Sequence, residues 1–170
     1  MNEIIVPEEN LLPRVEGFAG LFDCVKRARN GISRGAMGAA EACWHAAREY
    51  AMDRRQFGKP HAAMQFVQKK LADMQADSLV GLPGSLRLGR LMEERRRSAE
   101  LVSLMRRNNC GKALPIAREA RDVRGANGVS DESGTIQHVM NLGAANAYEG
   151  PHDAHAPNLG RGQAGLRAFQ

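Results

Sequence analysis

A ten-residue stretch, Asn146–His155, contains the side chain best placed to do chemistry. Glu149 follows an aromatic residue, Tyr148, and precedes a Gly-Pro pair that must interrupt any regular helix. A carboxylate at a bend between two helical stretches tends to enter a cleft. Burial beside apolar groups then raises its pKa toward that of a useful general base. The same ten residues also fit an exposed loop, so the rest of the chain must decide between the two interpretations.

The stretch allows a second chemistry, because Glu149 and His152 form a Glu-x-x-His unit. Di-iron helical bundles use two such units. Here the unit occurs once, and its Gly-Pro interior spoils the helical geometry that would align both ligands. We therefore expect no metal site, and we expect His152 and His155 to be polar residues at a helix start.

Length and composition bound the class of protein. The 170 residues suffice for one domain with a sizeable core, and the scarcity of aromatic residues beside abundant Ala, Leu, Met, Arg and Glu favours helix. No apolar run approaches the ~20 residues of a membrane span, and no signal peptide opens the chain. Three dispersed cysteines predict a reducing compartment, hence a cytoplasmic location.

The net charge of +5 suits anionic partners such as phosphates, but it is modest. The arginine runs at 95–97 and 106–107 lack interleaved aromatic residues and any base-reading motif. We therefore expect no nucleic-acid partner, and we expect most of these arginines to lie on solvated helix faces.

The first 21 residues differ from the remainder of the chain. Glu3–Pro7 is a short apolar run that ends at a proline, and Pro13 follows soon after. This predicts a strand and a linker over residues 1–21, followed by a helical domain over 22–170. A strand without a neighbouring strand suggests that it pairs with a β domain outside this chain.

Apolar residues at three- and four-residue spacing predict the elements that position Glu149. A first helix starts at Phe22 and ends before Gly58, and a second runs from His61 to about Met92 with a kink or break near Pro83. A third helix, a fourth with Ser130 as its N-cap and a last helical piece toward Phe169 follow. Four long helices with short connections predict an all-α, antiparallel up-down four-helix bundle.

Six motifs, in this order along the chain, are Val6–Pro13, Tyr50–Gly58, Gln68–Met74, Arg107–Ala113, Ala126–Glu132 and Asn146–His155. Together they resemble the C-terminal domain of the acyl-CoA dehydrogenases, and the sequence is most similar to that of glutaryl-CoA dehydrogenase. The resemblance implies a flavoprotein of fatty acid and amino acid catabolism, with FAD as cofactor and an acyl-CoA thioester as substrate. It also implies a homo-oligomer and electron-transfer flavoprotein as a partner. In the family a middle β domain precedes this bundle, which would account for the isolated strand.

The resemblance assigns roles to particular residues. Glu149 matches the base that removes the α-proton of the thioester while a hydride leaves the β-carbon, and Gly150 matches a small residue that lets substrate approach. The resemblance also offers an alternative for His152 and His155, as neighbours of the flavin. The residues that match flavin contacts, some of them across a subunit interface, are Arg54, Gln65, Asp122, Val123, Arg124, Gly125, Ala126 and Phe169. The residues that match the helix start along the acyl-CoA channel are Phe22, Asp23, Cys24, Val25, Lys26, Arg27, Ala28 and Arg29.

The sequence departs from the family pattern at several prolines. Pro83, Pro115 and Pro157 fall where the family has helix, and Pro151 replaces a threonine after the Glu-Gly pair. Arg124 and Ala126 alter a glycine-rich turn. These departures support an alternative function, a catalytically inactive helical module for interaction or oligomerisation.

Overall fold

The computed structural model describes residues 3–15, 17–96, 98–166 and 168. The α-helices of this part of the chain are α1 (Ala19–Asp53), α2 (Gln65–Glu93), α3 (Ala99–Val123), α4 (Thr135–Ala147) and α5 (His155–Ala164). A two-stranded antiparallel hairpin, β1 (Arg55–Gln56) and β2 (Lys59–Pro60), joins α1 to α2. The short 3-10 turns are η1 (Glu8–Asn10), η2 (His61–Ala63), η3 (Gly125–Gly128), η4 (Asp131–Ser133) and η5 (His152–Ala154).

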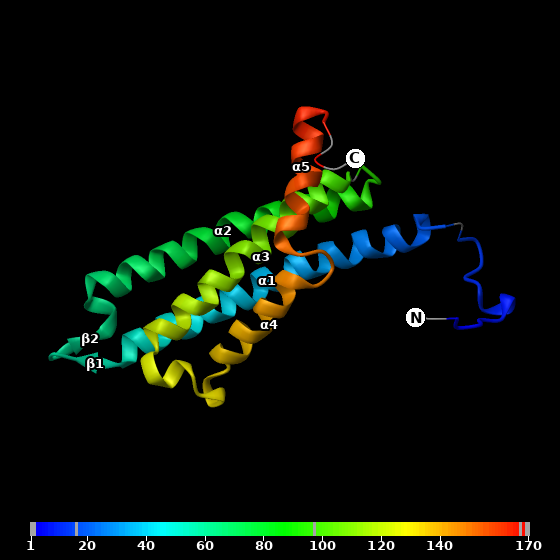
Figure 1. The fold of residues 1–170 in the computed structure, drawn as a ribbon. Helices are drawn as coiled ribbons and strands as arrows, with labels where there is room; N and C mark the ends of the chain where they lie inside the picture. The colour runs from blue at the N-terminus through cyan, green and yellow to red at the C-terminus, as the bar shows by residue number, and fades with distance from the viewer. Residues whose placement is uncertain (1–2, 16, 97, 167, 169–170) are drawn as a thin grey trace.

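Helices α1 to α4 lie side by side and reverse direction at each connection, and α5 leaves the bundle steeply (Figure 1). The hairpin and the connection from α3 to α4 lie at one end of the bundle, and the α2–α3 turn lies at the other. This arrangement confirms the predicted all-α antiparallel bundle. The Glu149 turn lies between α4 and η5, beside α1 and α3.

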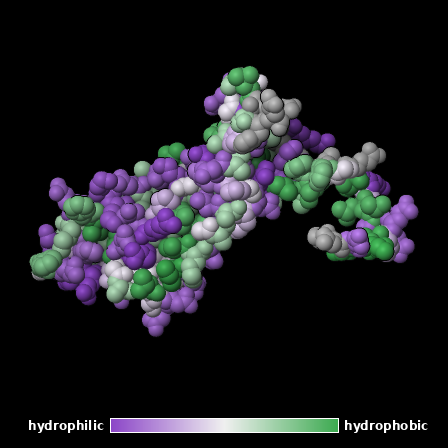
Figure 2. All heavy atoms as spheres, viewed as in Figure 1, coloured by the Kyte–Doolittle hydropathy of each residue, from purple (hydrophilic) through white to green (hydrophobic). Residues whose placement is uncertain are grey.

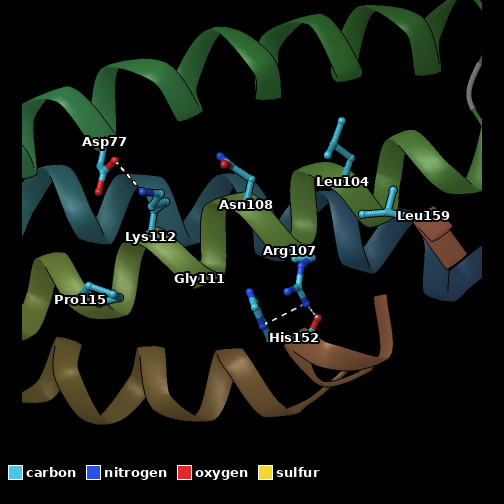
Figure 3. A pocket seen from close by; sticks show the side chains of 9 residues that line it. All are labelled: Asp77, Leu104, Arg107, Asn108, Gly111, Lys112, Pro115, His152 and Leu159. Atoms are coloured by element: carbon cyan, nitrogen blue, oxygen red, sulfur yellow. Dashed lines mark hydrogen bonds and ion pairs between the residues drawn. The ribbon is translucent and has the colours of Figure 1, made fainter. Parts of the chain in front are cut away.

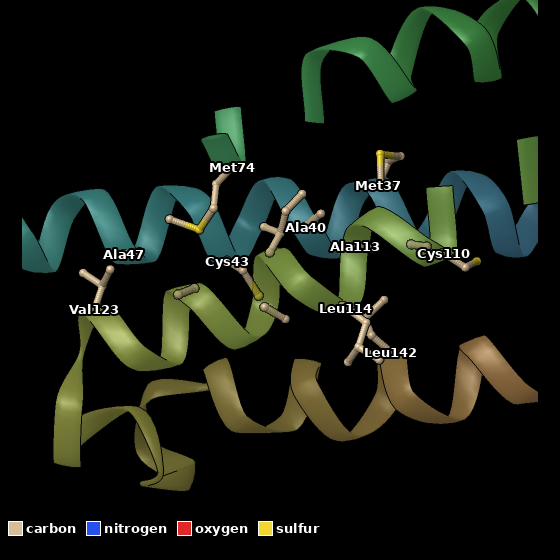
Figure 4. Packing of buried hydrophobic residues seen from close by; sticks show 14 of the residues in the cluster. Met37, Ala40, Cys43, Ala47, Met74, Cys110, Ala113, Leu114, Val123 and Leu142 are labelled. Carbon is tan, nitrogen blue, oxygen red and sulfur yellow. The ribbon is translucent and has the colours of Figure 1, made fainter. Parts of the chain in front are cut away.

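Small side chains bring α1 and α3 together (Figure 4). Ala40 and Ala47 of α1 and Ala113 and Ala117 of α3 are all fully buried. Alanines at a helix contact let two backbones approach closely, and larger side chains such as Met37 then fill the space toward α2. The close contact of α1 and α3 fixes the positions of the residues that these two helices direct toward the Glu149 turn.

A buried polar network fixes three helices relative to one another. The Asn109 side-chain amide on α3 donates to Ser33 Oγ on α1 at 3.0 Å and to Ser85 Oγ on α2 at 2.6 Å. Trp44 Nε1 on α1 also donates to the Leu71 carbonyl on α2 at 3.1 Å. Because buried donors without acceptors are costly, these bonds favour one register of the helices over its alternatives.

Pro83 and Pro115 do not end their helices. α2 is continuous through Pro83 and α3 through Pro115, so of the kink or break expected near Pro83 the break does not occur, and the kink stays a prediction. Pro157 lies in the first turn of α5, where a missing N–H costs little. Glycines on both sides of Pro83 give α2 room, since a Cβ at Gly81 would lie 2.3 Å from the Met37 sulfur.

Two further expectations differ from the structure. Ser130 does not cap α4, because the turn η4 intervenes and the N-cap position of α4 is Gly134, with a left-handed backbone at φ 66°. α1 begins at Ala19, earlier than the expected Phe22. The run 4–7 pairs with no described residue as a strand, and the division of the chain at residue 21 stays a prediction.

The N-terminal arm, residues 3–15, extends away from the bundle (Figure 1) and carries apolar side chains on its surface (Figure 2). Ile5 is 95% exposed, and Leu11 and Leu12 are more than two-thirds exposed. Exposed apolar side chains of this kind are poorly suited to water.

Candidate functional site

The turn after α4 has an unusual backbone. α4 ends at Ala147, Tyr148 is extended, and Glu149 and Gly150 have φ values of 57° and 93°. A left-handed glutamate costs on the order of 1 kcal/mol and persists only where neighbouring groups hold it. Pro151 then prevents helix from resuming at once, because it has no N–H and restricts the residue before it.

Two arginines from neighbouring helices hold the carbonyls of this turn. Arg29 Nε on α1 donates to the Glu149 carbonyl at 2.8 Å. On α3, Arg106 is fully buried and donates to the Tyr148 carbonyl at 2.8 Å and to the Ala145 carbonyl. Charge-assisted bonds of this kind are stronger than neutral ones, so α1 and α3 together fix the course of the turn.

The Glu149 carboxylate, by contrast, accepts no hydrogen bond and forms no ion pair within the described part of the chain. The residue is half-buried. A carboxylate whose backbone is fixed and whose oxygens are uncommitted can accept a proton from a bound molecule.

Two ionisable groups beside the turn have shifted pKa values. Burial, followed by the nearby charges of Arg29 and Arg106, lowers the pKa of His155 to about 4. Hydrogen bonds from His152 and Arg107 lower the pKa of Asp153 below its ordinary range. The imidazole of His155 is therefore neutral at pH 7, next to two cations.

Of the predicted substrate contacts in the first turns of α1, Arg29 bonds to the turn. Phe22 and Cys24 are exposed, and Asp23 forms an ion pair with Arg27 at 3.4 Å. Gly150 lies close to the Arg29 side chain, since a Cβ at Gly150 would lie 3.1 Å from a terminal nitrogen of Arg29. The structure thus brings together Arg29, Glu149 and Gly150 from the predicted set.

The predicted flavin contacts gather at the hairpin end of the bundle. Arg54 and the run Asp122–Ala126 line one depression of about 400 Å³. Gln65, the first residue of α2, does not line it, and Phe169 lies outside the described residues. The Arg124 guanidinium lies 5.4 Å from the centre of the Tyr50 ring, and the Asp122 carboxylate lies 3.6 Å from the Lys70 amine. The lining of the depression therefore includes a positive side chain, Arg124, and a negative one, Asp122.

This hairpin depression is far from Glu149. Arg29 and Arg54 are separated by 25 residues of α1, which at 1.5 Å per residue is roughly 37 Å. A single small molecule bound to one copy of the chain cannot contact both places.

Sequence reasoning missed Arg106, which binds the turn, and Ser103, which contacts His155. It expected His155 to be a polar residue at a helix start, and His155 does begin α5, but it is buried. Arg106 shares the buried face of α3 with Cys110 and Ala113, at helical spacing. An arginine on an otherwise apolar face is the signal that could have identified it.

A groove of about 490 Å³ beside the turn, lined in part by Arg107, Lys112 and His152, was also not predicted from the sequence (Figure 3). Arg107 in this groove donates to the His152 carbonyl at 2.8 Å, and Lys112 pairs with Asp77 at 3.0 Å. Both cations are therefore engaged by the chain itself, and we assign no ligand to the groove.

Within the described residues no cluster of three or more His, Cys, Asp or Glu side chains could hold a metal ion. His152 instead lies against Arg107 and Asp153, at 3.3 and 3.0 Å. None of the described helices is long and apolar enough to span a membrane. The three cysteines are free thiols, and burial raises the pKa of Cys43 to about 11.

Comparison with known proteins gives consistent similarities. Residues 16–163 match the family model "Acyl-CoA dehydrogenase, C-terminal domain". The short-chain-specific acyl-CoA dehydrogenase of Megasphaera elsdenii is 28% identical over 152 residues, which are 89% of this chain and 40% of that protein. The chain thus spans about 40% of the length of this curated relative.

Solved structures agree. The fold matches glutaryl-CoA dehydrogenase from Mycobacterium smegmatis with a TM-score of 0.91 and 38% identity, over 94% of this chain and 41% of that one. A structure of a glutaryl-CoA dehydrogenase from the same organism in complex with FADH2 matches with a TM-score of 0.90 and 34% identity, over 93% and 41%. These similarities confirm the resemblance that the six motifs predicted.

Proposed function

Because the chain belongs to the acyl-CoA dehydrogenase family, whose C-terminal domain it matches, we propose that it supplies the catalytic base of an FAD-dependent dehydrogenase of glutaryl-CoA or a similar thioester. The observation that carries this proposal is the Glu149 turn. Its carbonyls are held from α1 and α3, while its carboxylate has no partner among the described residues. The activity of the whole enzyme is part of the proposal, since the chain spans less than half of its relatives.

In the proposed reaction the Glu149 carboxylate removes the proton from the carbon next to the thioester carbonyl. The C–H electron pair becomes part of the new α,β double bond, and the proton stays on a Glu149 oxygen. Bound FAD supplies the oxidant, which accepts the hydride that leaves the β-carbon. Arg29 and Arg106 fix the turn, so that the carboxylate is directed before substrate arrives.

The hairpin depression fits a part of FAD. Arg124 and His61 line it, and each has one buried nitrogen, Arg124 Nε and His61 Nδ1, without a hydrogen-bond partner in the described part of the chain. Arg54 adds an exposed guanidinium suited to a pyrophosphate. We propose that Arg54 and Gln65 hold the pyrophosphate and adenine ends, with Asp122–Ala126 and Phe169 as further flavin contacts.

The distance between the two regions implies self-association. A dinucleotide whose flavin ring lies at Glu149 cannot reach the depression at the other end of the same α1, roughly 37 Å away. The depression therefore serves the flavin of a second copy, and the active form is a homo-oligomer. A clean monomer by light scattering at tens of micromolar, with the complete enzyme, would contradict this step.

The finer assignments follow from family membership. The first turns of α1, Phe22–Arg29, would line the acyl-CoA channel, with Arg29 and Gly150 nearest the reacting carbons. Electron-transfer flavoprotein would reoxidise the flavin, and the cytoplasm is the proposed location. The apolar arm would pack against a middle β domain, which the exposure of Ile5, Leu11 and Leu12 supports.

The test is a graft of this bundle onto the first two domains of an active relative. Glutaryl-CoA should bleach the flavin absorbance of the graft. Glu149→Gln keeps the shape and removes the base, so bleaching should slow by roughly 10²–10⁴-fold while thioester binding survives. Glu132→Gln, an exposed carboxylate in η4, is the matched control and should bleach normally. Similar rates in Glu149→Gln and the unchanged graft would refute the assignment.

A non-catalytic helical module is the alternative, and the exposed apolar arm is compatible with it. The visible spectrum separates the two functions. A graft that assembles and binds no flavin supports the module, whereas a yellow graft that bleaches with acyl-CoA supports the dehydrogenase.

A further inference from the structure

His155, the first residue of α5, lies next to the Glu149 turn. The residue is 1% exposed, and its Nδ1 lies 3.2 Å from Ser103 Oγ on α3. Its Nε2 is buried and has no hydrogen-bond partner in the described part of the chain. The same nitrogen faces Gly150, because a Cβ built at Gly150 would lie 3.4 Å from it. A buried polar atom thus points at the turn that carries the proposed base.

The charges around this imidazole determine its protonation. Arg29 approaches from α1, Arg106 from α3 and His152 from η5, and each disfavours a further positive charge. Together with burial they keep the ring neutral at pH 7, with its pKa lowered to about 4. A neutral imidazole has one N–H and one acceptor nitrogen.

Either nitrogen of the neutral ring can carry the proton. The Ser103 hydroxyl can donate to Nδ1 or accept from it, and when it donates, the ring proton lies on Nε2. An interaction with the Gly150 backbone is among the influences on the ring, and it favours the protonated form. In the tautomer with the proton on Nε2, the ring N–H faces Gly150.

We propose that His155 is a positioning residue for Glu149, which holds the Glu149–Gly150 turn by a neutral Nε2–H directed at Gly150. Arg29 and Arg106 bind the carbonyls of Glu149 and Tyr148, and the His155 ring approaches the turn at Gly150. A third cation in this place would be repelled by the two arginines, which is why a neutral donor suits it. The role of His155 in positioning the base for catalysis rests on the proposed function. Its role in stabilising the conformation of the turn does not.

The first experiment uses this chain as purified protein. Amide hydrogen exchange is measured in the unchanged chain, in His155→Leu, which removes the donor, and in His155→Gln, which retains one. His45→Leu changes an exposed histidine on α1 and is the matched control. We expect His155→Leu to accelerate exchange at Tyr148, Glu149 and Gly150 by roughly tenfold relative to α3, and His155→Gln to restore most of the protection.

Selective labelling of the histidine ring nitrogens provides a second readout. We expect the Nε2–H tautomer for His155 at pH 7, and a mixture of tautomers in Ser103→Ala, which removes the hydroxyl without enlarging any side chain. An Nδ1–H tautomer in the unchanged chain would overturn the proposal. Equal acceleration of exchange in the turn and in α3, or unchanged exchange in the turn, would overturn it as well.

The grafted enzyme separates this inference from the proposed function. If the graft bleaches with acyl-CoA, His155→Leu should lower the bleaching rate by roughly tenfold at saturating thioester with little change in thioester affinity. An unchanged rate would show that the hold on the turn does not position the base. A graft that never bleaches refutes the proposed function and leaves the exchange and tautomer results to decide the inference about the turn.

Discussion

The Glu149 turn and the hairpin depression are the two places where the family resemblance puts chemistry, and the chain treats them differently. At the turn, backbone carbonyls are bound by Arg29 and the fully buried Arg106. At the depression, Arg54 is exposed, and buried nitrogens of Arg124 and His61 lack partners among the described residues. Buried nitrogens without a partner among the described residues occur at the turn as well, on Arg106 and His155, so they do not separate the two places. The difference is that the carbonyls of the turn are bound by its own chain, whereas the exposed Arg54 guanidinium at the depression is available to another molecule.

This difference predicts where substitutions damage folding and where they damage binding alone. Residues that hold the turn should carry stability, because their removal leaves buried carbonyls unsatisfied. An exposed residue of the depression such as Arg54 should be nearly neutral for folding. Each prediction below tests one side of this contrast.

The largest stability effect is expected for Arg106→Ala. It leaves the carbonyls of Tyr148 and Ala145 unbonded and opens a cavity beside Cys110, so the free energy of unfolding should fall by about 4 kcal/mol. Urea unfolding monitored by circular dichroism measures it. Arg118→Ala, an exposed arginine on the same helix, is the control and should stay within about 0.5 kcal/mol. Equal losses for both arginines would end the argument that Arg106 acts through the turn.

The next effect is a pH dependence of stability that His155 causes. Its pKa is lowered to about 4 in the folded chain, against an ordinary value of 6.5, so the unfolded chain binds the proton more readily. Stability is therefore complete above pH 6.5 and is lost as the pH falls from 6.5 toward 4, by at most about 3 kcal/mol. Unfolding free energies at pH 7 and 4.5 check it, with His155→Gln as the reference that lacks the titration. Between pH 7 and 4.5 the unchanged chain should lose more unfolding free energy than His155→Gln. Equal losses in the two proteins would count against His155 as the titrating group.

A smaller effect is expected for Gly150→Ala. The backbone there has φ 93°, and the new methyl group would lie 3.1 Å from Arg29, so stability should fall by about 1–2 kcal/mol. Gly143→Ala within α4 meets no atom and should instead raise stability by about 0.5–1 kcal/mol. Thermal unfolding of both variants gives the comparison. A change in stability of the same sign in Gly150→Ala and Gly143→Ala would contradict the prediction.

The same contrast explains what the sequence could and could not predict. Helical periodicity and the Gly-Pro pair located the bundle and the bend at Glu149, because both are local properties of the chain. The bonds from Arg106 and the orientation of His155 depend on contacts between residues about 40 and 50 positions apart, which periodicity does not encode. Ser130 was wrongly assigned as the α4 cap, since Asp131–Ser133 can form a 3-10 turn before Gly134 starts the helix.

The prolines illustrate a second limit of sequence reasoning. Pro83 costs α2 a hydrogen bond, yet the helix continues because α1 packs against it closely, with Gly81 against Met37. Tertiary packing here outweighs a local preference of about 3 kcal/mol.

The smallest stability effect, and the sharpest test of the open site, is expected for Arg54→Ala. Arg54 is exposed and its guanidinium bonds to no described residue, so the free energy of unfolding should change by less than about 0.5 kcal/mol. If the depression holds the pyrophosphate of a neighbouring copy's flavin, however, the grafted enzyme should lose affinity for FAD by roughly tenfold, the scale of one charge-assisted contact. Equilibrium dialysis with FAD measures this, and Arg55→Ala, next to it in the hairpin and outside the depression, is the control. A fall in stability with unchanged FAD affinity would mean that the hairpin end is structural, because only a binding site can lose its ligand while the fold stays intact.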